Sequence, residues 1–428
     1  MHIVILALGS RGDVQPFVAL GRALQRAGHT VTIAAAADYG ALVTEHTVGF
    51  APVAGYISEL MDFAMVNALL DGAQNPLRFA RDFLRELDPL LTHIFTDCWA
   101  AAQEADLLIA STLGLLVGVH LLEKCTCPLV AVHMHPLFAD PERAHVNFPT
   151  GPHWLPLHRV YNGLTHHVGW HGLWQLLRAP LNRARRQALD LPPLTAWQLY
   201  RQARQPLPTL FAYSPVVAPP PTTPPLPPHQ RLTGDWPLPH PPGWRPPPAL
   251  ATFLQQGAPP VLVSFGSILG GREPNRMTAL LVDAFARSGQ RGLIYRGWGD
   301  LGNIPLPPTV LAIEHTPHDW LFPQLAAVVH HGGAGVTATA LRWGAPQVVV
   351  PVFGDQQFWG ERVQALHCGP PPIPRGQLTV DKLAAAITQA TTDPICAAGT
   401  VRMRELLQQE DGVAAAVAWL NTHLYARG

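Results

Sequence analysis

One stretch of the sequence, residues 327–360, concentrates residue types that could bind a phosphate and a sugar. Apolar residues at 326–329 predict a buried strand, a small-residue turn runs from His331 to Gly335, and a helical run begins at Val336. Glycines allow close approach of a ligand, and the free N–H groups at a helix start favour an anion. We therefore expect Gly333 and Gly335 to line a phosphate site beside His331.

Two polar residues follow the next strand of this region. The apolar run 347–352 predicts a second strand, which ends shortly before Asp355 and Gln356. In a doubly wound sheet, groups just beyond the carboxyl ends of the strands face the ligand crevice. We expect these two side chains to bind hydroxyl groups in the same crevice as the phosphate.

A second candidate lies near the N-terminus, where residues 2–8 predict a strand and residues 14–27 predict an amphipathic helix. Asp13 lies between them, next to Gly12, at a strand's carboxyl end. Aspartate is a favoured N-cap, so Asp13 either caps the helix or reaches into the crevice as a catalytic group. In the second half of the chain, the hydroxyl of Ser267 follows the strand 261–265 and suits a phosphate or ribose contact.

One interpretation of the glycine-rich turn is a dinucleotide site. Gly333-x-Gly335-x-x-Ala338 matches the GxGxxG/A fingerprint, and Asp355 lies close to the spacing expected of a ribose-binding acid. On this interpretation the protein is an NAD-dependent oxidoreductase. The match is short, so it is weak evidence by itself.

Four longer motifs favour a different interpretation. They are ALGSRGDVQPFVALGRAL (7–24), PHDWLFP (317–323), HHGGAG (330–335) and GDQQFWGERV (354–363). Together they resemble the bacterial sterol glucosyltransferase-like and antibiotic (glycopeptide, macrolide) UDP-glycosyltransferase family of the GT-B type. The resemblance covers nearly the whole chain. It implies an α/β fold of two facing doubly wound, Rossmann-like domains with the active site in the cleft between them.

The resemblance also implies an activity: inverting transfer of a hexose, with glucose the expected sugar, from a UDP-sugar to a hydroxyl of a large apolar acceptor. Asp13 would be the general base, and His331 would stabilise the departing diphosphate. The implied donor-binding residues are Gly12, Ser267, His315, His331, Gly333, Gly335, Thr337, Asp355 and Gln356. No Asp-x-Asp sequence occurs, which agrees with a transferase that needs no metal or other cofactor. A catalytically silent nucleotide-sugar-binding protein remains an alternative.

The phosphate motif departs from the family pattern at one position. Relatives commonly read HHGGAGTT, whereas this chain has Val336 followed by Thr337. A hydroxyl contact to phosphate is therefore missing at Val336. We expect either weaker donor binding or a contact that shifts to Thr337.

The aromatic residues of residues 133–177 suggest where an acceptor binds. Trp154, Trp170 and Trp174 lie there among helix-breaking prolines, and aromatic side chains on irregular segments commonly line apolar pockets. Ordinary core packing is the alternative for each tryptophan. Sterol, triterpenoid, polyketide and carotenoid alcohols all fit such a pocket.

Proline density predicts the domain boundary. Seventeen of the 45 prolines lie between Pro215 and Pro260, so we expect no regular core element there. The predicted organisation is an acceptor-binding domain (1–214), this linker (215–260), a donor-binding domain (261–411) and a terminal helix (412–428). By resemblance, that helix crosses back to the first domain.

Composition narrows the partners and the compartment. The formal net charge is zero, which argues against a nucleic-acid partner. Five cysteines without metal-type spacing and an N-terminus without a basic n-region favour the cytoplasm. The apolar run 107–122 is too short for a membrane span and predicts a strand followed by a buried helix. The arginine run 178–186 predicts a solvated helix face, with peripheral membrane contact as a secondary alternative.

Overall fold

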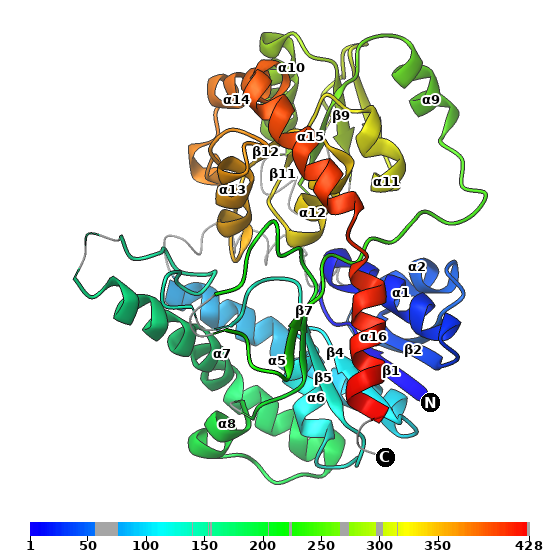
Figure 1. Cartoon of the computed structure of the whole chain (residues 1–428), viewed down its shortest axis with the longest axis vertical. Helices are drawn as coiled ribbons and strands as arrows, with labels where there is room; N and C mark the ends of the chain where they lie inside the picture. Colours follow the sequence, from blue (N-terminus) through cyan, green and yellow to red (C-terminus); the bar gives the residue numbers. More distant parts are fainter. Residues whose placement is uncertain are drawn as a thin grey trace. The chain divides into compact units, whose positions relative to one another are not determined.

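The computed structural model describes residues 1–55, 76–138, 140–152, 154, 156–203, 205–221, 225–265, 274–296, 303–314 and 316–425. They form two compact units (Figure 1). Of the described residues, unit 1 holds those up to Leu238 together with those from Asp411 onward, and unit 2 holds Pro239–Glu410. Each unit contains one parallel sheet, so the predicted α/β class with two doubly wound domains is confirmed.

Unit 1 is built on a seven-stranded sheet in the order β3-β2-β1-β4-β5-β6-β7. Its strands are β1 (His2–Leu6), β2 (Thr30–Ala36), β3 (Gly49–Val53), β4 (Leu107–Ala110), β5 (Leu129–His133), β6 (Thr209–Phe211) and β7 (Gln230–Leu232). Its helices are α1 (Arg11–Arg26), α2 (Gly40–Thr44), α5 (Pro76–Ala102), α6 (Leu115–Leu121), α7 (His158–Leu189), α8 (Ala196–Ala203) and α16 (Gly412–Tyr425).

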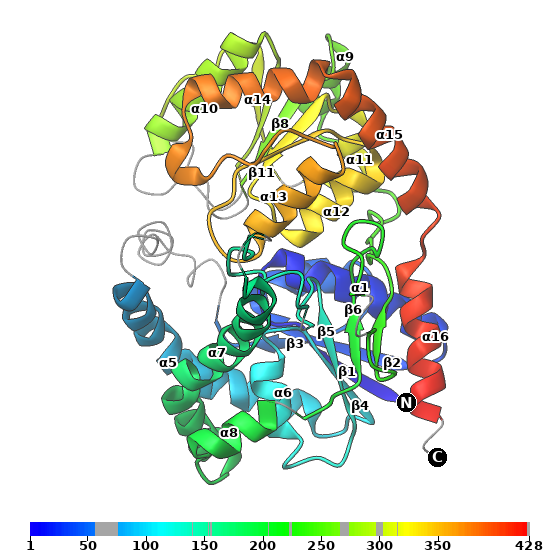
Figure 2. The same ribbon diagram turned by 60° about the vertical axis from the view of Figure 1, so that its left-hand side comes forward.

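Both faces of the central strands are buried, which explains why β1, β4 and β5 read as nearly unbroken apolar runs. Ile3 and Ile5 of β1 point to one face and pack with Phe17 of α1 and Leu420 of α16. Val4 and its alternate neighbours point to the other face, where α5, α6 and α7 cover them. Figure 2 shows α1 and α16 beside each other and α5 and α7 together elsewhere on the unit.

Unit 2 is built on a five-stranded parallel sheet in the order β10-β9-β8-β11-β12. Its strands are β8 (Val261–Ser264), β9 (Gly292–Tyr295), β10 (Val310–Ile313), β11 (Ala327–His330) and β12 (Gln347–Val349). Its helices are α9 (Pro248–Gln255), α10 (Pro274–Ser288), α11 (His318–Leu321), α12 (Ala334–Trp343), α13 (Gln356–Ala365), α14 (Val380–Thr392) and α15 (Pro394–Gln408).

Successive side chains of the strands in unit 2 also point to opposite faces of the sheet. Val261 and Val263 of β8 pack with α10 and α14, whereas Leu262 packs with α9 and the α11–α12 side. Because neighbouring strands are parallel in register, their carboxyl ends lie along one edge of each sheet. The turns that leave this edge carry Asp13 in unit 1 and His331, Gly333 and Asp355 in unit 2.

The expectation that residues 215–260 contain no regular core element is wrong. β7 pairs with β6 at the edge of the first sheet, where a strand needs ladder hydrogen bonds on one side only. Prolines flank this strand but do not interrupt it. Downstream, α9 begins at Pro248, because proline is tolerated in the first turn of a helix.

Two other predictions concern single segments. The apolar run 107–122 forms β4 and α6, as predicted, and Ser111 accepts the Gly114 N–H at 3.1 Å between them. At the end of the chain, α16 packs against α1 and thus belongs to unit 1. None of the described helices has a stretch both long and apolar enough to cross a membrane.

Candidate active site

Asp13 lies in the first turn of α1, directly after the loop that leaves β1. Its Oδ2 accepts hydrogen bonds from the Ser10 backbone N–H at 2.8 Å and from the Ser10 hydroxyl at 2.9 Å. Gly9 has φ +133°, and a Cβ there would lie 2.5 Å from Asp13 Oδ2. Glycine at this position therefore lets the carboxylate fold back against the turn, which fixes its place at the end of β1.

Asp13 is not the N-cap of α1, so the capping alternative is wrong about its position. The N-cap of α1 is Ser10, and Asp13 is the third helical residue, because the helix begins at Arg11 and not after Asp13. The bond from Asp13 to the Ser10 N–H is one half of a capping box. Gly12 is the second helical residue and is exposed. Burial, and next the charge of Asp13, raise the pKa of the Tyr39 hydroxyl, so the phenol near this carboxylate stays neutral.

The neighbouring strand ends support this turn. Ser111 Oγ donates to the Leu8 carbonyl at 3.0 Å and accepts the Leu8 N–H at 3.1 Å, which ties the end of β4 to the loop before α1. Thr112 Oγ1 lies 3.0 Å from Nδ1 of His133, the last residue of β5. Burial lowers the pKa of His133 to about 3, so its imidazole is neutral. Sequence reasoning assigned no role to His133; the signal for it is a histidine ending an apolar strand.

In unit 2, the side chain of His330 stabilises the glycine-rich turn through hydrogen bonds. Its Nδ1 accepts the Gly332 N–H at 3.0 Å, and its Nε2 lies 2.8 Å from Gln347 Oε1 on β12. These partners assign the proton to Nε2 of a neutral ring, because a backbone N–H needs an acceptor at Nδ1. Burial is the main cause that lowers the pKa of His330 to about 3. We did not predict this role; the signal is a polar pair, His330 and Gln347, inside two apolar strands.

His331 follows at the start of the turn. Burial lowers its pKa, an effect opposed by the charge of Asp355 and by a hydrogen bond to the Ser264 backbone. Nδ1 of His331 has no hydrogen-bond partner among the described residues. Burial therefore keeps the imidazole neutral, with one buried nitrogen that has no partner among the described residues.

The helix that follows the turn presents its amino end to the same edge of the sheet. Gly333 is the N-cap of α12, so the N–H groups of the first turn, including that of Gly335, have no partner within the helix. Gly332 adopts φ +90°, and a Cβ there would lie 2.7 Å from the Gln356 carbonyl. The turn can thus offer amides to an anion only with glycine at 332.

The structure bears on the expected contact at Thr337. Thr337 is 1% exposed, and its hydroxyl has no partner among the described residues. Val336 packs against the apolar cluster between α9 and α12. The hydroxyl of Thr337, the second threonine of the family pattern, therefore lies inside the unit, and the Thr337 N–H bonds to the Gly333 carbonyl at 3.0 Å.

Asp355 and Gln356 begin α13, beside the β11–α12 turn. Asp355 is the N-cap residue, and its Oδ2 accepts the Trp359 indole N–H at 2.8 Å. Gln356 is 5% exposed, and its Oε1 accepts the backbone N–H groups of Val352 and Phe353 at 2.8 and 3.2 Å. Gln356 thus shapes the loop after β12, and Trp359 orients Asp355, a function that sequence reasoning did not assign.

Some of the remaining predicted residues lie outside the described part of the chain, and the others differ in exposure. Ser267 and His315 lie outside the described residues, as does the side chain of Trp170 on α7. Trp154 is 80% exposed, whereas Trp174 is 1% exposed and packs edge-on against His120. The packing interpretation is therefore correct for Trp174, which lies in the core of unit 1 and not on a pocket wall.

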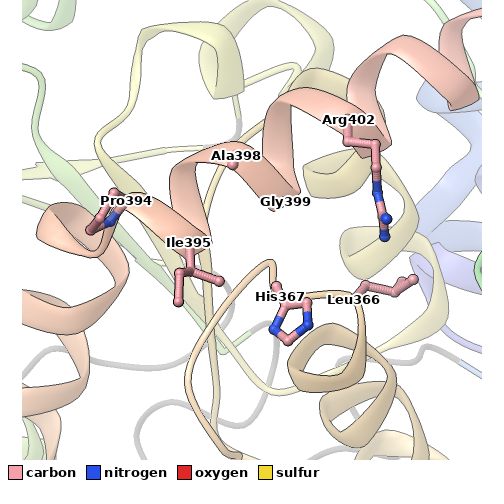
Figure 3. A pocket seen from close by; sticks show the side chains of 7 residues that line it. All are labelled: Leu366, His367, Pro394, Ile395, Ala398, Gly399 and Arg402. Carbon is pink, nitrogen blue, oxygen red and sulfur yellow. The ribbon is translucent and has the colours of Figure 1, made fainter.

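A separate hollow of about 380 Å³ lies in unit 2, between the residues at the end of α13 and the first half of α15 (Figure 3). Its walls are Leu366, His367, Pro394, Ile395, Ala398, Gly399 and Arg402. None of the predicted site residues lines it. In the described part of the chain, no three His, Cys, Asp or Glu side chains gather into a group that could hold a metal ion.

Family models match both halves of the chain. Residues 3–141 match the glycosyltransferase family 28 N-terminal domain, and residues 298–413 match the C-terminal domain of erythromycin biosynthesis protein CIII-like proteins. Sterol 3-beta-glucosyltransferase UGT80B1 of Arabidopsis thaliana is 33% identical over 443 residues, covering 99% of this chain and 68% of the plant protein. The chain belongs to the sterol glucosyltransferase-like family. It is a glycosyltransferase.

Other relatives and solved structures extend this result. A sterol 3-beta-glucosyltransferase of Emericella nidulans is 34% identical over 442 residues. The aligned region covers 97% of this chain but only 29% of the fungal protein. The calicheamicin glycosyltransferase CalG4 has a TM-score of 0.65 at 20% identity, covering 99% of this chain and 98% of CalG4. The glycosyltransferase VinC, solved with dTDP, has a TM-score of 0.60 at 19% identity, covering all of both chains. These structures confirm the GT-B fold.

Proposed function

We propose that this glycosyltransferase moves a hexose from a nucleotide diphosphate donor to a hydroxyl of a large apolar acceptor, with inversion at the anomeric carbon. The observation that carries the proposal is the β11–α12 turn. There, His330 Nδ1 accepts the Gly332 N–H, and the first N–H groups of α12 have no partner within the helix. A diphosphate is the anion such a site suits.

Asp13 is the proposed general base. An alcohol becomes a good nucleophile when a base removes its proton. In the proposed step the acceptor O–H gives its proton to Asp13, and the oxygen forms a bond to the anomeric carbon. The bond from that carbon to the diphosphate breaks, and the leaving nucleotide takes the electron pair. Ser10 supports this role because it fixes Asp13 Oδ2 through two hydrogen bonds.

His331 and the α12 amides are the proposed stabilisers of the leaving diphosphate. Preorganised donors aimed at developing negative charge are a large source of rate acceleration. The unpartnered Nδ1 of His331 supports this role, since a nearby diphosphate favours the protonated form of an imidazole and turns that nitrogen into a donor. We propose that Gly333 and Gly335 complete the phosphate site and that no metal is required.

Asp355 is the proposed ligand of the sugar hydroxyls, with Gln356 shaping the loop beside it. The hydrogen bond from Trp359 supports a fixed orientation of the Asp355 carboxylate. We propose glucose as the sugar and a sterol-like alcohol as the acceptor, because the Arabidopsis and Emericella relatives are named sterol 3-beta-glucosyltransferases. Gly12, Ser267 and His315 remain proposed donor contacts, and Trp154 and Trp170 remain proposed acceptor contacts.

A nucleotide panel tests the donor assignment. Purified protein is melted with UDP, UDP-glucose, dTDP and NAD, each in large excess. A ligand at 100 times its dissociation constant adds about 2.7 kcal/mol of stability. We expect UDP to raise the melting temperature and NAD to leave it unchanged; a response to dTDP alone would move the donor to thymidine nucleotides. Equal stabilisation by NAD would favour an oxidoreductase, and UDP binding without transfer to any sterol, triterpenoid or polyketide alcohol would favour a silent binding protein.

A further inference from the structure

Unit 1 exposes an unusual concentration of apolar side chains at the start of α7. Of the fifteen large hydrophobic side chains exposed in the described chain, six lie between residues 154 and 168. They are Trp154 (80% exposed), Leu157 (67%), Val160 (65%), Leu164 (58%), Val168 (50%) and Tyr161 (36%). We call these six side chains the α7 face. Single exposed hydrophobic residues are ordinary, but a contiguous group marks an interaction surface.

Helical spacing places four of these six residues together. Leu157, Tyr161, Leu164 and Val168 follow each other at steps of four, three and four residues, which is one stripe along a helix. The adjacent side of the same turns is buried, with Asn162 at 0% and Thr165 at 4% exposure. The helix therefore has a packed side and an apolar outer side. In Figure 1, α7 lies at the left side of unit 1, next to α8.

A chain of stacked rings extends the exposed surface from α7 to α8. His167 stacks on His171, His171 lies 4.4 Å from the ring of Tyr200, and Tyr200 stacks on Trp197 at 5.2 Å. Trp197 is 61% exposed. Tryptophan has a large apolar body and a polar N–H, so it suits a boundary between water and an apolar phase.

Arginines outnumber acidic residues in this part of the sequence. Between Arg143 and Gly234 the sequence contains one acidic residue, Asp190, and nine arginines, although the net charge of the whole chain is zero. Arg178 and Arg186 on α7 and Arg201 on α8 are exposed, and none of the three has an acidic partner among the described residues. Four of the other arginines pair with acidic residues from outside this stretch: Arg143 with Asp140, Arg159 with Glu142, Arg183 with Asp88 and Arg185 with Glu123.

We propose that the α7 face docks this glycosyltransferase onto the surface of a membrane that contains anionic phospholipids. Helices that lie in a membrane interface combine Trp and Leu on one side with Arg or Lys on the other, and an anionic surface attracts each such cation. The α7 face supplies the apolar contact, and Arg178, Arg186 and Arg201 supply charge complementarity. A second copy of this chain fits less well, because two such arginine-rich surfaces would repel each other.

Vesicle sedimentation tests this proposal without donor or acceptor, so the result does not depend on the proposed transfer reaction. The full chain is pelleted with vesicles of phosphatidylcholine mixed with phosphatidylglycerol, and with pure phosphatidylcholine vesicles. We expect binding to the mixed vesicles that weakens as salt is raised. The double variant Leu157→Ser/Leu164→Ser should bind roughly tenfold or more weakly, because both leucines lose their contact with acyl chains. Arg178→Gln/Arg186→Gln should weaken binding to the mixed vesicles by about fivefold per charge.

Matched controls come from unit 2. Ile395 and Val401 on α15 are 61% and 55% exposed, so Ile395→Ser/Val401→Ser removes comparable apolar surface elsewhere and should bind as wild type does. Arg245→Gln/Arg402→Gln is the corresponding charge control. Circular-dichroism melting checks that every variant folds. No sedimentation of wild type, or equal binding by the leucine variant, would overturn the proposal. A dimer in light scattering that the leucine variant abolishes, with no vesicle binding, would assign the face to self-association instead.

Discussion

Two turns share one backbone arrangement but differ in chemistry: the β1–α1 turn of unit 1 and the β11–α12 turn of unit 2. Each follows a buried parallel strand and opens a helix, and each contains a glycine at positive φ, Gly9 at +133° and Gly332 at +90°. In unit 1 the turn is held by the Asp13 carboxylate bonding to the Ser10 N–H, whereas in unit 2 it is held by the neutral ring of His330 bonding to the Gly332 N–H.

This difference decides what each turn can offer a substrate. The carboxylate at the first turn repels an anion and can accept a proton. The second turn has free amides and no carboxylate of its own, so it favours an anion. The same strand, turn and helix therefore supply a base in one unit and a phosphate site in the other, and the choice depends on the side chain that stabilises the turn.

The strongest test of the comparison is Asp13→Asn. The asparagine carbonyl can still accept the Ser10 N–H, so the capping box and the fold should remain. Loss of the proton acceptor should lower kcat on the order of 100-fold or more. Turnover, UDP affinity and melting temperature are measured together, with Asp88→Asn on α5 as control. Near-normal turnover would leave Asp13 with a structural role only.

His331→Ala tests the other turn. We expect a loss of about 2 to 4 kcal/mol in transition-state stabilisation, read from kcat/KM, because one preorganised group that faces developing charge is removed. The melting temperature should change little. His331→Gln, which keeps a hydrogen-bond donor, should recover part of the loss. An unfolded His331→Ala protein would instead assign this side chain to the core.

Gly332→Ala tests whether the second turn needs its backbone geometry. The added Cβ would lie 2.7 Å from the Gln356 carbonyl and 2.8 Å from Val349 Cγ1, in a conformation that L side chains rarely adopt. We expect a loss of about 1 to 3 kcal/mol in unfolding free energy by urea denaturation. Gly376→Ala is the control, since its Cβ would meet nothing within 4 Å. Equal stability of the two variants would show that the turn tolerates a different path.

Trp359→Phe gives the smallest effect and separates orientation from packing. Removing the indole N–H takes one hydrogen bond from Asp355, worth about 1 kcal/mol, so the donor KM should rise about fivefold. Trp236→Phe is the matched control: that indole is also buried and donates to Thr233 Oγ1 at 3.1 Å, but in unit 1. Both variants should lose some stability. A similar rise in donor KM for both would argue against a positioning role for Trp359.

Much of this architecture could be predicted from the sequence, and the failures have identifiable causes. The long apolar runs predicted β1, β8 and β11, and the turn residues predicted where the chemistry lies. Asp13 was misplaced within its helix because a capping box leaves the N-cap three residues earlier, at Ser10. Trp174 was misassigned because aromatic composition does not distinguish a pocket wall from a core. The roles of His330 and Trp359 depend on partners 17 and four residues away, which spacing alone did not identify.

The position of α16 has a consequence for biosynthesis. Unit 2 is inserted within unit 1, because the chain leaves unit 1 after Leu238 and returns to it at Asp411. Residues of α16, such as Ala416 and Leu420, belong to the core that covers β1, yet a ribosome adds them only after all of unit 2. Domains generally fold as units during synthesis. Synthesis of unit 1 therefore begins before that of unit 2 and ends after it. The apolar face of unit 1 that α16 covers stays exposed in the nascent chain while unit 2 is made and folds.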